Sequence, residues 1–157
     1  EFLAGVASCL PGRLHDCNSQ DISNVVYAFG RLGLYNEGVL RAVAGRIAGQ
    51  AAQGRLDDFS PQAISNIVHA YGLLRYRHDG MLQAVALHMP AKIHEFSHQN
   101  ISNVMLGFAW LGHRHPGSMR TVAAQLAGPR GLADFTPQAM CNTVYAFTQL
   151  GVGGRRE

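Results

Sequence analysis

Glutamine and asparagine recur together four times along the chain, always four residues apart. The pairs stand at positions 20 and 24, 62 and 66, 99 and 103, and 138 and 142. Side-chain amides both donate and accept hydrogen bonds, so they can make paired contacts to the edges of nucleic acid bases. A separation of four places each pair on one face of a helix. The pairs therefore predict a polar stripe that recurs about every 38 residues, as in a stacked repeat array.

Two further positions complete this stripe, and unlike the amides they change from unit to unit. On a wheel of about 100° per residue, Gln62, Asn66, His69 and Leu73 fall within a stripe about 60° wide. The corresponding residues of the other units are Gln20, Asn24, Tyr27 and Arg31; Gln99, Asn103, Leu106 and Trp110; and Gln138, Asn142, Tyr145 and Gln149. Constant amides beside variable positions fit a module that reads a linear polymer such as single-stranded RNA.

The variable positions are rich in rings that would stack on bases. Tyr27, His69, Trp110 and Tyr145 would each contribute roughly 1–3 kcal/mol per stacked base. A second interpretation stays open for the amides, because a repeated Asn often bonds a neighbouring backbone carbonyl and ties units together. We therefore expect ligand contact chiefly at the variable positions.

Arginine and histidine gather in the turns that follow the amide-bearing segments. These turns contain Arg75, Arg77 and His78, then His113, Arg114 and His115, and finally Arg155 and Arg156. Repeated turns lie along one edge of a stack, and guanidinium groups there suit the phosphates of a nucleic acid backbone. The alternative interpretation is a solvated loop edge without a ligand.

The amide pairs lie on predicted helices, called A helices here, whose starts are well marked. Ser60, Ser97 and Thr136 are suitable N-caps. Pro61 and Pro137 stand at the first helical position, where a missing amide hydrogen does no harm. The flanks of each A helix carry small residues, which predicts close packing of neighbouring A helices.

A second predicted helix, the B helix, follows each A helix and carries Leu-x-Ala-Val-Ala or a variant, as at 40–44 and 82–86. In the first unit, Cys17 and Asn18 stand where the other units have Phe and a Ser or Thr cap, so we expect a looser helix start. Pro90 is expected to end its B helix one turn early. Glycines such as Gly33 and Gly112 are expected to close the A helices.

The whole chain, 1–157, is thus predicted to be one all-α repeat array. We expect a right-handed α-solenoid of antiparallel helix pairs about 38 residues long. The expected boundaries are 1–16 for the second helix of a preceding repeat, 17–58, 59–95 and 96–134 for three repeats, and 135–157 for the first helix of a further repeat. Incomplete units at both ends predict a fragment of a longer array.

The composition and the missing motifs argue against several classes of function. With 47% hydrophobic and 15% charged residues the chain is globular, and its net charge is only +3. We find no phosphate-binding glycine–lysine loop, dinucleotide fingerprint or nucleophile elbow, and the histidines lack Cys or carboxylate partners at metal-ligand spacing. No stretch approaches the roughly 20 apolar residues of a membrane span. We predict no enzymatic activity, no cofactor, no metal and no membrane insertion, with Cys9, Cys17 and Cys141 as buried free thiols.

The recurring residues resemble the octotricopeptide repeat family, helical-hairpin repeats found chiefly in organelle proteins of green algae. The family pattern reads Phe-x-Pro-Gln-x-Leu-x-Asn-x-Leu-Trp-Ala-Phe-Ala-x-Leu-Gly. Matching residues are Phe59, Pro61, Gln62, Ile64, Asn66, Val68, Ala70 and Tyr71, and again Phe135, Pro137, Gln138, Met140, Asn142, Val144, Ala146, Phe147, Leu150 and Gly151. Tyr27 and Tyr145 supply the aromatic expected before the Ala, His69 does so less closely, and Leu106 departs from it.

This resemblance implies a role in gene expression in the mitochondrion or the chloroplast. The protein would bind single-stranded RNA without catalysis, to stabilise it, process it or help translate it. Similar repeats occur in mitochondrial RNA-processing proteins and in apicomplexan organelle proteins, and some members are structural proteins of organellar ribosomes. The alternative is therefore a scaffold that binds ribosomal RNA or protein within such a ribonucleoprotein or another large assembly. A third interpretation is the binding part of a larger processing enzyme.

Overall fold

The computed structural model describes residues 1–129 and 131–151, and this part of the chain is all-helical, as predicted, with no strand. Four α-helices carry the amide pairs: α2 (Ser19–Leu32), α4 (Pro61–Leu74), α6 (His98–Leu111) and α8 (Pro137–Gln149). Four others alternate with them: α1 (Phe2–Arg13), α3 (Glu37–Ala52), α5 (Asp79–Lys92) and α7 (Pro116–Ala127). Three short 3-10 helices join the second set to the first: η1 (Leu14–Asp16), η2 (Leu56–Asp58) and η3 (Ile93–Glu95).

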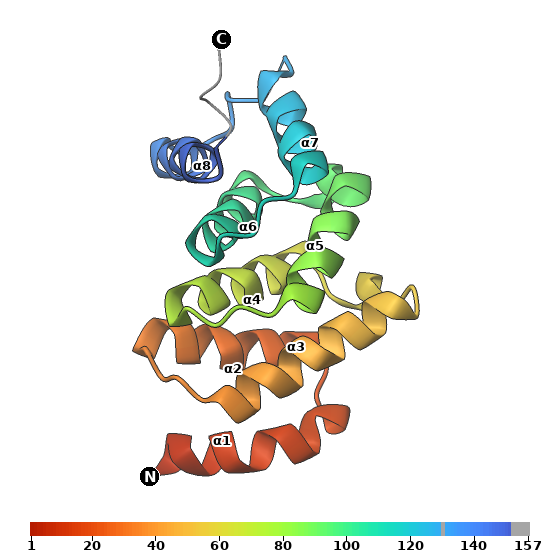
Figure 1. The fold of residues 1–157 in the computed structure, drawn as a ribbon, viewed down its shortest axis with the longest axis vertical. Coiled ribbons are helices and arrows are strands. Elements are labelled where there is room, and N and C mark those ends of the chain that lie inside the picture. The colour runs from red at the N-terminus through yellow and green to blue at the C-terminus, as the bar shows by residue number, and fades with distance from the viewer. Residues whose placement is uncertain (130, 152–157) are drawn as a thin grey trace.

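The helices stack in two rows (Figure 1). In the A row, α2 packs against α4, α4 against α6, and α6 against α8. In the B row, α1, α3, α5 and α7 pack in the same sequential way. Since each B-row helix returns the chain across the stack, the A-row helices run in the same direction. The core lies between the rows, where Phe29, Leu40, Ile67, Tyr71 and Leu82 are buried.

The starts of the A-row helices are fixed by side-chain caps. Ser60, Ser97 and Thr136 each accept a hydrogen bond from the backbone amide three residues on, which confirms the predicted N-caps. The expectation of a looser start in the first unit is wrong. Asn18 caps α2 through the Asp21 amide, and the Asp21 carboxylate accepts from the Asn18 amide in return. This reciprocal capping box satisfies two backbone donors that the helix itself cannot.

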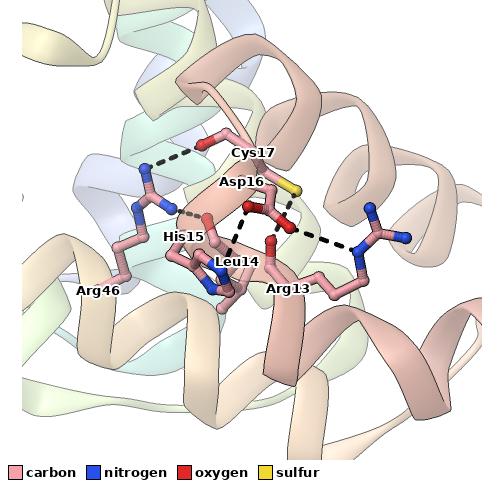
Figure 2. A network of polar contacts seen from close by, with 6 residues as sticks. All are labelled: Arg13, Leu14, His15, Asp16, Cys17 and Arg46. Atoms are coloured by element: carbon pink, nitrogen blue, oxygen red, sulfur yellow. Dashed lines mark hydrogen bonds and ion pairs between the residues drawn. The ribbon is translucent and has the colours of Figure 1, made fainter.

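An arginine of the B row braces the same corner (Figure 2). Arg46 of α3 donates one guanidinium hydrogen to the carbonyl oxygen of Leu14 and another to that of Cys17, the latter at 2.9 Å. Arg13 lies beside the Asp16 carboxylate on the other side of η1, at 3.4 Å. Carbonyls at a helix end need such partners, so the clamp ties α3 to the segment that links α1 with α2.

Three A-row helices, α2, α4 and α6, end in the left-handed region of the backbone. Gly33 and Gly112 have φ of 66° and 65°, as expected for glycine closures. In the second unit Arg75 takes the equivalent place with φ of 56°. For a residue with a β-carbon this conformation costs about 1–2 kcal/mol. Arg75 is therefore held in an unfavourable conformation that its glycine counterparts adopt freely.

Pro90 does not end its helix, which corrects the prediction. The helix α5 continues to Lys92 with Pro90 inside it. A proline has no amide hydrogen for the carbonyl four residues earlier, here that of Ala86. The hydroxyl of Ser118 on α7 donates to this carbonyl at 2.6 Å. A bond from the next B-row helix therefore replaces the one that the proline removes.

The small flanks of the A helices do bring them into close contact. A β-carbon at Gly30 would lie 2.7 Å from the β-carbon of Ala70, so α2 and α4 touch through their backbones. Asn100 Nδ2 donates to Ser65 Oγ at 3.1 Å and links α6 to α4. The prediction of buried thiols is wrong for Cys9 and Cys141, which are exposed, whereas Cys17 is half-buried against the core. Cys9 lies in α1 and Cys141 in α8, at opposite ends of the described stack, where fewer helices cover them.

Candidate nucleic-acid interface

The amide columns lie at the surface of the A row. Gln20, Gln62, Gln99, Gln138 and Asn24 are exposed, and Asn66, Asn103 and Asn142 are half-buried. In two units the pair is joined within its own helix. Gln20 Nε2 donates to Asn24 Oδ1 at 2.8 Å. Gln99 Nε2 donates in the same way to Asn103 Oδ1 at 2.9 Å.

These bonds leave part of each amide for a ligand. A bond from glutamine to asparagine uses one of the two glutamine hydrogens and one lone pair of the asparagine oxygen. The asparagine N–H₂ group can still donate hydrogen bonds, and the glutamine oxygen can still accept them. The amide that joins α6 to α4 is a different one, Asn100, so the Gln and Asn columns stay a predicted contact surface.

The variable positions differ in their access to solvent. Tyr27 is 40% and Tyr145 47% exposed, and Leu73, Arg31 and Gln149 are also exposed. Leu106 was expected on the stripe, but it is only 5% exposed. The helix α6 packs against both α4 and α8, and an apolar side chain at that position gains more by burial than by contact with water. Of the two variable positions in the third unit, Trp110 is therefore accessible to a ligand and Leu106 is not.

His69 and Trp110 form a pair across two units. Their ring centroids are 5.3 Å apart, with the planes tilted by 45°. The indole also lies against Gly72, where a β-carbon would come within 2.8 Å of its Cε3 atom. A ring of α6 thus leans over α4 and rests on a position that carries no side chain. Both rings are half-buried.

The charge state of His69 follows from its surroundings. Burial lowers the pKa of the imidazole below its usual 6.5, and the positive charge of Arg31 on α2 lowers it further. His69 is therefore neutral at about pH 7. Its Nδ1 atom is buried without a hydrogen-bond partner among the described residues. A neutral ring of this kind stacks without repelling the arginines nearby.

Part of the predicted phosphate edge serves the fold itself. Arg77 donates to the carbonyl oxygens of Leu111 at 2.6 Å and Gly112 at 3.0 Å, and pairs with Asp79 at 2.7 Å. It thereby satisfies carbonyls at the end of α6 and joins the second unit to the third. Arg75 donates to the Trp110 carbonyl oxygen in the same region, and both arginines are exposed.

The histidines of this edge are structural as well. His78 and His115 cap α5 and α7, each accepting a backbone amide hydrogen at Nδ1. His113 is 7% exposed and packs edge-on against Phe108, with 5.0 Å between the ring centroids. Arg75, Arg77 and Arg114 are all exposed along this edge, and Arg77 is the one bonded to both a carboxylate and two carbonyls. Arg155 and Arg156 lie outside the described residues.

Sequence reasoning missed two parts of this surface. It placed Arg75 on the phosphate edge, whereas Arg75 Nη1 also donates to the carbonyl oxygen of Trp110 at 3.1 Å. It treated Gly72 only as one of the small residues beside the stripe, and did not predict that the Trp110 ring packs against it. The available signal was an arginine where the other units have glycine, together with a bulky ring facing a glycine in the preceding unit.

Comparison with known proteins adds no assignment to this geometry. Neither the protein-family models nor the curated proteins contain a match to this chain. Within 1–129 and 131–151, no cluster of three or more His, Cys, Asp or Glu could hold a metal ion. None of the helices in these ranges is long and apolar enough to cross a membrane. The surface of the A row is thus the candidate site that the observed geometry supports.

Proposed function

We propose that this chain is a non-catalytic module that binds single-stranded RNA along the A row. The observation that carries the proposal is the surface on which amide pairs alternate with Tyr27, Tyr145 and the His69–Trp110 pair. Amides suit hydrogen bonding to base edges, and aromatic rings stack on bases regardless of sequence. A row of parallel helices repeats this combination along a line, as a single-stranded polymer requires.

The proposal includes the finer architecture and the cellular role. The array would be a right-handed α-solenoid with repeats of about 38 residues, of the octotricopeptide type. The recurrence of A-row helix starts at Ser19, Pro61, His98 and Pro137 supports this repeat length. On the resemblance to that family, the RNA belongs to the mitochondrion or chloroplast, and binding stabilises it, processes it or helps to translate it.

The two edges of the A row differ in charge, which sets the path of the RNA. The edge at which the A-row helices end carries exposed Arg75 and Arg114, with Arg31 in the last turn of α2. The connectors at the other edge carry the acids Asp16, Asp57, Asp58, Glu95 and Asp134. Four of these acids pair with Arg13, Arg55 or Lys92, so the connectors have no excess of positive charge. Phosphates are therefore attracted to the first edge more than to the second. The sugar–phosphate backbone would therefore follow the Arg75–Arg114 edge, with the bases over the stripe.

Fluorescence anisotropy of a labelled single-stranded RNA tests this function. We expect binding that weakens steeply from about 50 mM to about 200 mM salt, because phosphate contacts release counterions. The double variant Tyr27→Ala, Tyr145→Ala should bind at least about tenfold more weakly, given about 1–3 kcal/mol per stacked base. Leu87→Ala, at an exposed position of α5 in the B row, is the control and should bind normally. Affinity no better than that of an unrelated protein of charge +3 would overturn the proposal.

A scaffold role within an organellar ribosome or another large assembly is the second candidate. Two observations favour it: the net charge is only +3, and Arg77 is occupied by backbone carbonyls. Nucleic-acid-binding domains are usually more basic. Crosslinking in organelle extracts, followed by identification of the attached RNA and proteins, separates the two. Crosslinks from the A-row surface to protein or to ribosomal RNA alone would favour the scaffold, and crosslinks to other single-stranded RNA would favour the proposed RNA-binding module.

A further inference from the structure

We infer that the junction between α4 and α6 is a composite nucleotide site, in which Trp110 and His69 hold one base and Arg75 holds its phosphate. This inference rests on the proposed function. It adds where one nucleotide binds, which side chain contacts which part of it, and that two repeats share each binding site. The unit of recognition is the junction between two repeats, because the site takes side chains from both. The ligand class is one nucleotide within single-stranded RNA.

The platform for the base is already assembled. The Trp110 indole lies against Gly72 and 5.3 Å from the His69 ring, so its position is fixed by α4 and not by its own helix alone. The indole is half-buried, so part of it still contacts solvent. A ring that is held in place loses little conformational entropy when a base stacks on it. Leu73, exposed one turn beyond His69, adds an apolar border.

Arg75 stands beside this platform at an energetic cost. Its backbone adopts the left-handed conformation with φ of 56°, where equivalent positions carry Gly33 and Gly112. Backbone strain of this kind persists where the surrounding structure and a function maintain it. One guanidinium hydrogen bonds the Trp110 carbonyl oxygen at 3.1 Å, and the exposed side chain keeps its other donors for a phosphate.

The charges at the site favour an anionic ligand, and the flat rings favour a nucleotide over an acidic peptide. His69 is held neutral by burial and by Arg31 of α2, so the charge beside the rings comes from Arg31 and Arg75. The acid of α2, Asp21, lies in the first turn, at the opposite end of that helix from Arg31. A flat neutral platform next to guanidinium groups matches a base joined to a phosphate.

The other two junctions of the described A row lack this combination. The equivalents of His69, Trp110 and Arg75 are Tyr27, Leu73 and Gly33 between α2 and α4, and Leu106, Gln149 and Gly112 between α6 and α8. The first junction keeps one aromatic ring and no arginine at the helix end. In the second, the leucine is buried and no ring is present. The α4–α6 junction is therefore expected to contribute more to the affinity for RNA than either of the other two junctions.

Trp110 is the single tryptophan of the chain, so its fluorescence reports on this site alone. We would titrate the protein with 5′-labelled single-stranded oligouridine and oligoadenosine, reading label anisotropy and tryptophan emission together. We expect the emission to be quenched with the same midpoint as the rise in anisotropy. Trp110→Leu should weaken binding about tenfold, with circular dichroism confirming its helical content.

Arg75→Gly separates function from folding. Glycine adopts the left-handed conformation without strain, so the melting temperature should stay equal or rise. Affinity should nevertheless fall about fivefold to tenfold, and the dependence of log Kd on log salt should lose about one unit of slope. Arg41→Ala, an exposed arginine of α3 in the B row, is the matched control and should leave both unchanged.

The outcomes distinguish this inference from the proposed function. RNA binding without tryptophan quenching, and with normal affinity of Arg75→Gly, overturns the composite site and leaves RNA binding intact. No RNA binding by the unmodified protein overturns both. Quenching by polyglutamate with none by RNA assigns the site to an acidic protein partner and also overturns the inference. Concordant quenching together with weaker binding by a stable Arg75→Gly variant supports it.

Discussion

Gly107 of α6 lies directly against Val68 of α4. A β-carbon at position 107 would be 2.6 Å from both the Cγ1 atom and the carbonyl oxygen of Val68. The two helices therefore touch through backbone atoms, and a carbonyl group cannot move aside as a flexible side chain can. This contact sets how closely the two units stack, and thereby how the Trp110 ring reaches over α4.

Replacement of Gly107 by alanine should destabilise the protein. The added methyl group clashes with the α4 backbone, at a cost of about 1–3 kcal/mol for overpacking, which outweighs the helix propensity that alanine gains. Urea unfolding followed by circular dichroism measures the effect. Gly45→Ala on α3 is the control, because nothing lies within 4 Å of a β-carbon there. That variant should be more stable by roughly 0.5–1 kcal/mol, and equal effects of the two would contradict the close contact.

Local features of this fold could be predicted from sequence because neighbouring residues determine them. The caps Ser60, Ser97 and Thr136, and the glycine closures Gly33 and Gly112, depend only on the backbone a few residues away. Other features depend on residues far apart in the chain, such as pairs separated by 29 and 32 positions. Such features include the Arg46 clamp on the Leu14 and Cys17 carbonyls, which periodicity cannot indicate.

For the candidate site as well, some features could be predicted from sequence and others depend on packing between helices. Helical periodicity identified the residues that share a face, and Tyr27 and Tyr145 are exposed on it. Periodicity could not indicate that Leu106 would be covered, since the packing of α6 between two neighbours decides its burial. Nor could it show that Arg77 would satisfy carbonyls of the next unit, because charge and position suited a phosphate equally well.

Acid should weaken the fold through His113. Burial lowers the pKa of this imidazole, and the charges of Arg77 and His115 lower it further, while Asp79 opposes them. The unfolded chain, with a histidine pKa of about 6.5, then binds more protons than the folded protein between that value and the lower folded one. The free energy of unfolding must therefore fall as pH drops below about 6.5, by at most about 1.4 kcal/mol per pH unit for one proton.

Urea unfolding at about pH 7.5, 6.5 and 5.5 measures this loss. His113→Phe removes the titrating group and keeps an aromatic ring against Phe108, so its stability should fall less over the lower interval. His69 and His88 also have lowered pKa values and will leave a residual slope. An identical slope in the variant and the unmodified protein would remove His113 as a source of acid sensitivity.

The bond from Ser118 to the Ala86 carbonyl should matter only because residue 90 is proline. In Ser118→Ala the buried carbonyl loses its donor, and Pro90 has no amide hydrogen to replace it, so we expect a loss of about 1–3 kcal/mol. In a Pro90→Ala background the amide of residue 90 can bond this carbonyl within α5. The same serine substitution should then cost clearly less. A double-mutant cycle by urea unfolding gives the coupling between the two positions directly, since each variant is compared in both backgrounds. A coupling energy near zero would mean that the hydroxyl does not substitute for the missing amide, and that α5 continues past Pro90 for another reason.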